Sequence, residues 1–363
     1  MEETAEVTIA FYISSPTWGG GEQYVYDLAS ALKTSGKITP VFLFPKSSDQ
    51  EMIRRFGEIG ECPTFPFAGK MYRFSGLASY RLAKLLEHYE ADILHINSRF
   101  AYFQAAMAKL MCKHRIRLIA VQHLVRQAKD NQLWRWAYGQ IDTLICVSQL
   151  VRRNYIPDGL EDAFKQIEVV HNSVRIEKRT CNNPDYSSAR IIYHGRICEE
   201  KGVIVLLRAL EKIQDLPWEL YMAGAVESKY KEQWERALED SPVKSRVKML
   251  GFRSDIREEL SHYSIGVIPS VVQEAFSLSA LEDMSCGLAI ASSDNGAVSE
   301  FVSDGENGLL VKSNDADALS KTLRQLISNP QLRKRLGYQA QKDFWERYNY
   351  DIFLDRMNRI YGI

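Results

Sequence analysis

Short apolar runs alternate with longer segments in which apolar residues recur at helical spacing, and this pattern persists along the whole chain. It is typical of parallel strands joined by crossover helices, with both faces of the sheet covered. The chain is therefore predicted to be an α/β protein. The strands predicted in its first half, enough for one doubly wound sheet, are 7–13, 39–44, 92–96, 118–122, 143–147 and 167–170.

The second half repeats this architecture after a polar interruption at 172–190, which is typical of an exposed connector. We therefore predict an N-terminal domain at 1–172, a linker at 173–189, a second domain at 190–345, and a C-terminal helix at 346–363 that packs back on the first domain. The predicted strands are 190–193, 219–223, 247–250, 265–268, 288–291 and 309–311, and the predicted closing helices are 316–327, 331–346 and 352–361.

Length and composition support two soluble domains and exclude several classes of protein. A chain of 363 residues suits two domains, and 45% hydrophobic with 25% charged residues excludes intrinsic disorder. The 46 basic residues balance the 46 acidic ones, which argues against a general nucleic-acid binder. Six cysteines without a Cys-x-x-Cys pair indicate neither a zinc ribbon nor a disulfide framework, so a reducing cytoplasmic compartment is expected.

A glycine cluster follows the first predicted strand and precedes a helix. Gly19, Gly20 and Gly21 would let backbone N–H groups approach an anion or a polar sugar at the helix N-terminus. A dinucleotide-binding Gly-x-Gly-x-x-Gly fingerprint fails because Tyr24 stands three positions after Gly21. A simple tight turn explains the glycines equally well.

Two cations follow the first strand of the second half. Arg196 offers a planar fork for phosphate oxygens and Lys201 a mobile point charge, so together they could neutralise a diphosphate. The alternative is a pair of surface cations neutralised by Glu199 and Glu200.

Two glutamates with seven residues between them lie around the start of another predicted helix. Glu274 belongs to the loop before this helix, whereas Glu282 lies more than a turn inside it. The N–H groups of Ser277, Leu278 and Ser279 would attract a phosphate through the helix dipole. Acidic residues at this spacing are usually solvated surface, but the apolar neighbours of Glu282 make a wholly exposed position less expected.

Together these residues resemble the GT-B glycosyltransferases of family 4 (glycosyl transferases group 1), and the resemblance covers nearly the whole chain. It implies two Rossmann-like doubly wound domains facing each other across a cleft that holds a nucleotide-sugar donor. The Glu274 and Glu282 pair is its most specific part. Supporting motifs are Gly195-Arg196 with Lys201-Gly202, Met222-Ala223-Gly224, Gly251-Phe252 and Gly308-Leu309-Leu310-Val311.

The resemblance also implies roles for residues of the second domain. Gly195, Arg196 and Lys201 would hold the donor diphosphate, Glu282 the ribose hydroxyls, and Glu274 the transferred sugar. The sequence departs from the family at Ser277 and Ser279, where Gly and Pro or another small residue are frequent, so phosphate approach is expected to be more crowded. His194 is expected to be structural.

In the first domain, two strand ends resemble those that border the family's reaction centre. His123 is the leading candidate for a catalytic role beside Glu274, and His95 the weaker one, since a lone histidine more often satisfies a local backbone group. Asn97 and the three glycines at 19–21 are assigned to the acceptor or sugar side.

The function implied is a retaining glycosyltransferase that moves a sugar from a nucleoside diphosphate sugar to an acceptor hydroxyl, as in polysaccharide or glycoconjugate synthesis. Two alternatives stay open: a nucleotide-sugar epimerase or hydrolase on this scaffold, and a non-catalytic sugar-nucleotide binding protein. No metal or other cofactor is expected. Asp315 and Asp317 have the spacing of a metal motif from another glycosyltransferase fold, but Asp315 is better explained as a helix N-cap.

A basic and aromatic stretch in the first domain suggests contact with a membrane. Residues 70–117 include nine basic but only three acidic residues, with aromatic residues interleaved. Such a face could touch anionic lipid or a lipid-linked acceptor at the inner side of the membrane, although solvated helix faces explain most such excesses. The basic residues are Lys70, Arg73, Arg81, Lys84, Arg99, Lys109, Lys113, Arg115 and Arg117.

Overall fold

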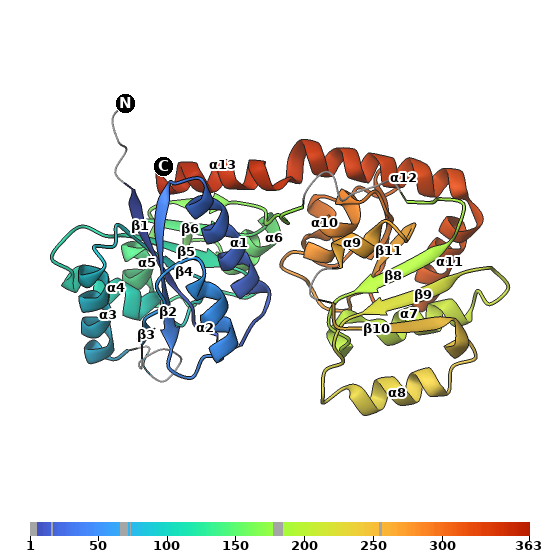
Figure 1. Ribbon diagram of the computed structural model, residues 1–363, viewed down its shortest axis with the longest axis horizontal. Coiled ribbons are helices and arrows are strands. Elements are labelled where there is room, and N and C mark those ends of the chain that lie inside the picture. The colour runs from blue at the N-terminus through green and yellow to red at the C-terminus, as the bar shows by residue number, and fades with distance from the viewer. Residues whose placement is uncertain (1–5, 16, 66–71, 73, 177–183, 254–255) are drawn as a thin grey trace. The chain divides into compact units, whose positions relative to one another are not determined.

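The computed structural model describes residues 6–15, 17–65, 72, 74–176, 184–253 and 256–363, which fall into two compact units. Unit 1 comprises the chain up to His171 together with Phe353–Ile363, and unit 2 comprises Asn172–Ile352. Figure 1 shows that each unit is a sheet covered by helices, as the alternating pattern predicted. None of the described helices is both long and apolar enough to span a bilayer.

Unit 1 is built on a parallel sheet whose described strands follow the order β3-β2-β1-β4-β5-β6-β7. The central strands bury both faces, which explains their near-continuous apolar sequences. Its strands are β1 (Val7–Tyr12), β2 (Ile38–Pro45), β3 (Thr64–Phe65), β4 (Ile93–Ile96), β5 (Arg117–Gln122), β6 (Thr143–Cys146) and β7 (Ile167–Val169). Its helices are α1 (Gly20–Thr34), α2 (Gln50–Gly57), α3 (Gly76–His88), α4 (Tyr102–Met111), α5 (Gln132–Gln140) and α6 (Gln149–Tyr155), with the 3₁₀ turn η2 (Glu161–Ala163).

Polar caps fix where several of these helices begin. Asp49, Ser75, Asn131 and Ser148 each accept a hydrogen bond from the backbone N–H three residues further on. Such a cap contributes about 1 kcal/mol because it satisfies an N–H group that has no partner within the helix.

Unit 2 repeats the architecture with the described strand order β10-β9-β8-β11-β12-β13, all neighbours being parallel. Its strands are β8 (Arg190–His194), β9 (Glu219–Ala223), β10 (Val247–Gly251), β11 (Ile265–Ile268), β12 (Ala289–Ser293) and β13 (Gly308–Val311). Its helices are α7 (Val203–Glu211), α8 (Lys231–Glu239), α9 (Arg257–Leu260), α10 (Leu278–Ser285), α11 (Ala316–Ser328) and α12 (Pro330–Asp343), with the 3₁₀ turns η4 (Glu199–Lys201), η5 (Lys244–Arg246) and η6 (Ala297–Glu300).

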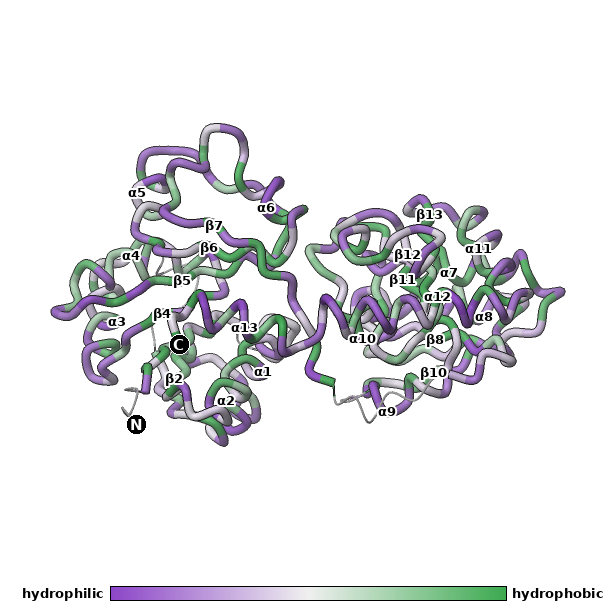
Figure 2. The backbone as a smooth tube through the Cα atoms, turned by 90° about the horizontal axis from the view of Figure 1, so that it is seen from above, coloured by the Kyte–Doolittle hydropathy of each residue, from purple (hydrophilic) through white to green (hydrophobic). Residues whose placement is uncertain are grey.

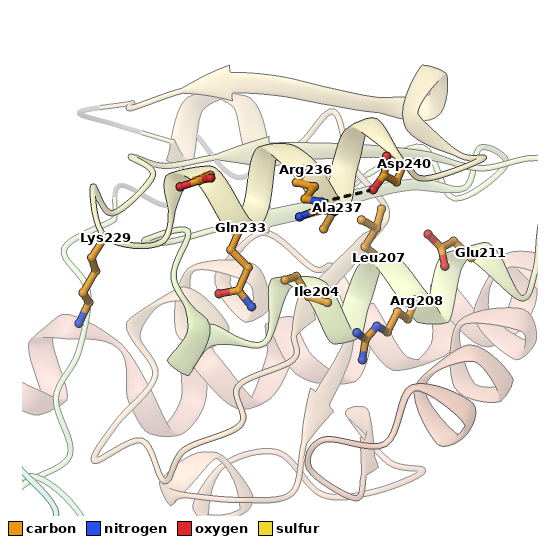
Figure 3. Close-up of a pocket in the computed structure, with 10 residues that line it drawn as sticks. Ile204, Leu207, Arg208, Glu211, Lys229, Gln233, Arg236, Ala237 and Asp240 are labelled. Atoms are coloured by element: carbon orange, nitrogen blue, oxygen red, sulfur yellow. Dashed lines mark ion pairs between the residues drawn. The ribbon is translucent and has the colours of Figure 1, made fainter.

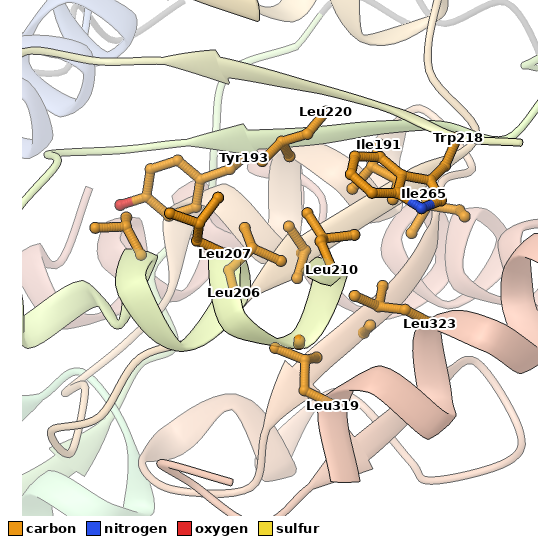
Figure 4. Close-up of a cluster of buried hydrophobic side chains, with 14 of the residues drawn as sticks. Ile191, Tyr193, Leu206, Leu207, Leu210, Trp218, Leu220, Ile265, Leu319 and Leu323 are labelled. Atoms are coloured by element: carbon orange, nitrogen blue, oxygen red, sulfur yellow. The ribbon is translucent and has the colours of Figure 1, made fainter. Parts of the chain in front are cut away.

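The largest buried cluster of unit 2 joins its sheet to α7 and α11. Figure 4 shows Leu206 and Leu210 of α7 between the strands and Leu323 of α11, with Trp218 closing one end. The hydropathy colouring of Figure 2 agrees with this arrangement, since β11 and β12 are largely apolar whereas α12 is strongly hydrophilic along much of its length.

Both sheets reverse their strand order at one point, β1 beside β4 in unit 1 and β8 beside β11 in unit 2. Loops that leave the carboxyl ends of two such strands diverge to opposite faces of the sheet and leave room for a ligand. The predicted glycine cluster and Asn97 follow β1 and β4. Arg196, Lys201 and Glu274 follow β8 and β11.

Most predicted elements are present, and three differences have local causes. The two-residue strand β3 is too short to leave a pattern. The helix predicted at 331–346 ends at Asp343 and continues as the π-helix η7 (Phe344–Tyr348), before α13 (Tyr350–Tyr361). The connector at 173–189 is not exposed throughout its described parts, because Val174 lies in the unit 2 core and the Tyr186 hydroxyl donates to the Gly287 carbonyl; residues 177–183 are outside the described chain.

Candidate functional site

The loops after β8 and β11 place a lysine beside a glutamate. Lys201 Nζ lies 2.8 Å from Glu274 Oε1, and the two side chains are 27% and 12% exposed. The sequence predicted both residues as site residues but did not predict that they form an ion pair. Both side chains are mostly buried but still reach the surface, so this cation and carboxylate can bind a polar, charged ligand.

Neighbouring groups fix the position of Glu274. The Ser270 hydroxyl donates to the same Oε1 atom, and the Glu274 backbone pairs with Gly296 in an isolated parallel bridge. A side chain at Gly296 would crowd the Glu274 backbone, and its φ of 106° also favours glycine. The Glu274 carboxylate is therefore held in place by the fold rather than left to move with its loop.

Gly202 allows the Lys201 loop to lie directly against the loop after β11. Its φ is 66°, and a Cβ atom there would overlap the carbonyl oxygen of Pro269. The Val271 N–H donates to the Glu200 carbonyl at 2.9 Å, which joins the two loops a second time. The glycine is thus needed for the contact that brings Lys201 to Glu274.

Arg196 lies at the surface of the same loop. Its side chain is 64% exposed, and its guanidinium is 3.7 Å from Glu200, the surface partner that the alternative hypothesis named. The Tyr193 hydroxyl donates to the Arg196 carbonyl, and the Gly195 N–H donates to the Ala223 carbonyl. The backbone is fixed while the arginine side chain stays available to a ligand.

Helix α10 begins where the sequence predicts. Ser277 is its N-cap and accepts from the Ala280 N–H at 3.4 Å, and Leu278 is its first residue. The Ser279 hydroxyl donates to the His194 carbonyl at 2.8 Å, so this side chain is turned to the end of β8. The first N–H groups of the helix have no acceptor one turn earlier, which makes this end suited to an anion.

Glu282 lies one turn further along α10 and is 20% exposed, so its expected partial burial is confirmed. Its Oε2 atom is 3.5 Å from Nδ1 of His194, and the other ring nitrogen of His194 is 2.9 Å from Oδ1 of Asp283. The sequence analysis assigned His194 a structural role but did not identify Asp283 as its partner.

In unit 1 the glycine cluster is helical at two of its three positions. Gly19 is the N-cap of α1, whereas Gly20 and Gly21 form its first turn, so the loop predicted to hold three glycines is shorter than expected. The Glu22 carboxylate lies beside Gly19, and burial raises its pKa although nearby backbone N–H groups oppose this effect. Sequence reasoning missed Glu22, which its place after the glycines in the first helical turn could have indicated.

Asn97 lies between two histidines in unit 1. Its Oδ1 atom accepts from His95 Nε2 at 3.0 Å and lies 3.4 Å from His123 Nε2, while the Tyr361 hydroxyl donates to His95 Nδ1 at 2.7 Å. Burial lowers the pKa of His95 to about 3 and that of His123 to about 4, so both rings are neutral. His95 is buried with both nitrogens engaged, which fits a structural role, whereas His123 is only half-buried.

Only some of the basic residues between 70 and 117 are exposed to solvent as predicted. Arg117 donates to the Tyr361 and Ile360 carbonyls, so it binds the end of α13 rather than facing solvent; this part of the prediction is wrong. Lys109 is likewise paired with Asp142. Lys70 and Arg73 lie outside the described residues.

Exposed apolar side chains also lie on α3 and α4, two helices that run side by side (Figures 1 and 2). Lys113 and Arg115 are exposed just after α4. We call this surface the α3–α4 face; Leu110 and Met111 are its exposed apolar residues next to these cations, whereas Phe74, Leu77 and Tyr80 are exposed toward the other end of the helix pair.

Two further features do not belong to the predicted site. Asp315 accepts from the Ala318 N–H at 2.8 Å as the N-cap of α11, which confirms its interpretation as a cap. A surface cavity of about 570 Å³ lies between α7 and α8, where Figure 3 shows Ile204, Leu207 and Arg208 on α7 and Gln233 and Arg236 on α8. It is lined by none of the residues that the sequence predicted.

Comparisons with known proteins agree with this architecture. The model of Glycosyltransferase Family 4 matches residues 18–178, and that of Glycosyl transferases group 1 matches residues 174–343. A glycosyltransferase of Methanocaldococcus jannaschii is 27% identical over 80% of this chain and 82% of its own. The phosphatidyl-myo-inositol mannosyltransferase of Mycobacterium leprae is 25% identical over 94% of this chain and 92% of its own. The structure of HepE from Anabaena in complex with UDP has a TM-score of 0.81 at 16% identity, covering 98% of this chain and 99% of that one.

The two doubly wound domains, together with the similarity of the whole chain to solved glycosyltransferase structures, assign it to the GT-B fold class. With both halves matched by the corresponding models, the chain belongs to the family 4 glycosyltransferases. These matches favour a transferase over the epimerase, hydrolase and non-catalytic binding protein that the sequence left open.

Proposed function

We propose that this glycosyltransferase moves a sugar from a nucleoside diphosphate sugar to a hydroxyl of a sugar or lipid-linked acceptor, with retention at the anomeric carbon. The observation that carries the donor assignment is the Lys201–Glu274 pair beside the N-terminus of α10. A diphosphate needs cations and amide N–H groups, and a developing oxocarbenium ion is stabilised by a carboxylate.

Each donor-side residue has a distinct partner in this proposal. Lys201, Arg196 and the first N–H groups of α10 bind the diphosphate and stabilise the charge that develops as it leaves. Glu274, fixed by Ser270 and Gly296, lies at the transferred sugar, and Glu282 accepts from the ribose hydroxyls. The UDP bound to the structurally similar Anabaena protein supports a nucleotide ligand.

In unit 1, His123 is the proposed catalytic contact. As a neutral imidazole whose single N–H is directed at Asn97 Oδ1, it keeps a lone pair on Nδ1 that can accept a hydrogen bond from a sugar hydroxyl. Asn97 holds one of its nitrogens at 3.4 Å, while the edge of the Tyr24 ring packs against it with centroids 4.9 Å apart. Retention itself is inferred from the family resemblance.

Replacing Glu274 tests the chemical role. Glu274→Gln keeps the shape of the side chain but removes its charge, so kcat should fall roughly 100-fold while nucleoside diphosphate affinity stays within about threefold. Turnover is measured with a panel of UDP- and GDP-linked hexoses against a free sugar, phosphatidylinositol vesicles and a polyprenyl-diphosphate sugar. The matched control is Glu235→Gln, an exposed glutamate of α8.

Proton NMR of fresh product completes this test. The donor's anomeric configuration should be kept in the wild type and in any residual activity of the variant. An inverted product would overturn retention, and Glu274→Gln with wild-type kcat would overturn the role of the carboxylate.

We propose that no metal ion takes part, because Lys201, Arg196 and the α10 N-terminus supply positive charge where a metal supplies it in other transferases. Turnover should therefore be unchanged in EDTA. Loss of activity in EDTA, with recovery on adding magnesium or manganese, would overturn this part of the proposal.

The α3–α4 face is proposed to bind anionic lipid and so bring the enzyme to a lipid-linked acceptor. Apolar side chains such as Leu110 and Met111 can enter the headgroup region while Lys113 and Arg115 attract anionic headgroups. The relative that acts on phosphatidyl-myo-inositol supports an acceptor of this kind.

Vesicle sedimentation tests the lipid contact. Binding to vesicles with phosphatidylglycerol should weaken with salt and with Lys113→Glu plus Arg115→Glu, because attraction between exposed charges is screened. The matched control is Lys229→Glu plus Lys231→Glu in unit 2, which should bind as the wild type does. Equal binding by both double variants would overturn the assignment.

A further inference from the structure

A buried ionic triad lies directly behind the proposed ribose-binding residue. The ring of His194 lies between two consecutive carboxylates of α10, with Nε2 at 2.9 Å from Asp283 and Nδ1 at 3.5 Å from Glu282. Asp283 is only 1% exposed, whereas Glu282 is 20% exposed. The triad therefore runs from the interior of unit 2 to its accessible surface.

The fold makes specific room for Asp283. A Cβ atom on Gly266 of β11 would overlap the Asp283 carboxylate, so the glycine creates the space that this side chain fills. Oδ2 of Asp283 has no hydrogen-bond partner among the described residues. A buried carboxylate with one unsatisfied oxygen is costly unless a positive charge lies close to it.

An imidazolium at His194 supplies that charge. A neutral ring carries one N–H and would turn its lone pair to one of the two carboxylates, whereas a protonated ring donates to both. Burial alone would lower the pKa of His194, but Asp283 and Glu282 outweigh it and raise the pKa. The positive charge of Lys201, on the turn η4, acts in the opposite direction and lowers the pKa of His194.

A second contact joins the backbone of His194 to the same helix. The Ser279 hydroxyl donates to the His194 carbonyl, so the end of β8 is bonded to α10 through both its backbone and its side chain. The His194 ring is thus held beside α10, 3.5 Å from the Glu282 carboxylate, where its charge acts on that side chain.

We propose that His194, protonated and shared between Asp283 and Glu282, is a positioning residue that holds Glu282 for the ribose hydroxyls of the donor and makes their recognition weaken as the pH rises. This inference rests on the proposed function, because it takes Glu282 as the ribose contact. His194 itself touches no substrate.

The test compares each nucleoside diphosphate with its 2′,3′-dideoxy form. Isothermal titration with ADP, GDP and UDP selects the tightest ligand, and its affinity ratio over the dideoxy form is measured from pH 6 to pH 9. Ionisation of the phosphates affects both ligands alike, so the ratio reports ribose recognition alone. In the wild type the ratio should be about tenfold at pH 6, because a hydrogen bond to a charged group such as the Glu282 carboxylate contributes about this much to affinity. It should fall toward one at pH 9, where His194 has lost its proton.

Variants separate the positioning role from a general loss of structure. His194→Gln cannot gain a proton, so its ratio should be low and independent of pH, and Asp283→Asn should move the fall of the ratio to lower pH. His262→Gln, which changes an exposed histidine of the same unit, should keep the wild-type profile. If the single variants fail to fold, the apolar double variant His194→Val with Asp283→Ala removes both charges together, which is often tolerated.

The outcomes distinguish this inference from the proposed function. A wild-type ratio near one at every pH would overturn the ribose role of Glu282 and the inference with it. A large ratio that is independent of pH, or one that keeps its pH profile in His194→Gln, would overturn the inference alone.

Discussion

Acid should destabilise unit 1 through His95, the buried histidine within β4. Its ring is fully enclosed, with Asn97 on Nε2, the Tyr361 hydroxyl on Nδ1 and Phe11 packed at 5.2 Å between ring centroids. Burial, with a smaller contribution from His123, lowers its pKa to about 3, against an ordinary value of 6.5. The folded state therefore keeps His95 neutral while the unfolded chain takes up a proton.

The sign and size of the effect follow from this difference. A depressed folded pKa means that stability is fully present above pH 6.5 and is lost as the pH falls toward 3. Between pH 7 and pH 5 the loss is about 2 kcal/mol for His95 alone. His123, whose pKa is lowered to about 4, adds to the same slope, although its partial exposure reduces its share.

Hydrogen exchange followed by mass spectrometry, corrected for intrinsic rates, measures the opening free energy of peptides that contain β4. We expect it to fall by about 2 kcal/mol on acidification from pH 7 to pH 5, and the fall to be smaller in His95→Gln. The peptide containing His194 is an internal control, because its raised pKa gives the opposite sign. An NMR titration midpoint of His95 above pH 6, or an unchanged slope in His95→Gln, would refute the reasoning.

Three further substitutions probe the site and its supports. Lys201→Ala should weaken nucleoside diphosphate binding by about 10-fold or more but spare the free nucleoside, and equal losses by calorimetry would contradict the phosphate contact. Gly202→Ala should lower the free energy of unfolding in urea by more than about 2 kcal/mol, because the new Cβ meets Pro269 at a positive φ; an unchanged midpoint would contradict this. Tyr361→Phe should cost about 1 kcal/mol and raise exchange in α13, since His95 loses its donor; unaltered exchange would show that the hydroxyl is dispensable.

Local patterns in the sequence are sufficient to predict most of the fold. Each central strand is a buried apolar run and each helix shows its own periodicity, so the two series of strands and the start of α10 at Ser277 are readable one segment at a time. The glutamate pair and the Lys201 loop could be found for the same reason, because their spacing along the chain reflects strand ends and helix starts. The cap at Asp315 is local as well.

Contacts between distant segments could not be predicted in this way. From the sequence, Arg117 is indistinguishable from any other surface cation. In the structure it donates to the last carbonyls of α13, more than two hundred positions later in the chain. His194 and Asp283 are 89 residues apart, and only the packing of α10 on β8 and β11, with room left by Gly266, makes them a pair. A segment's hydrophobic pattern determines which element it forms. The partners of its polar groups depend on how those elements pack, because burial turns a charge from a solvated group into one that needs a neighbour.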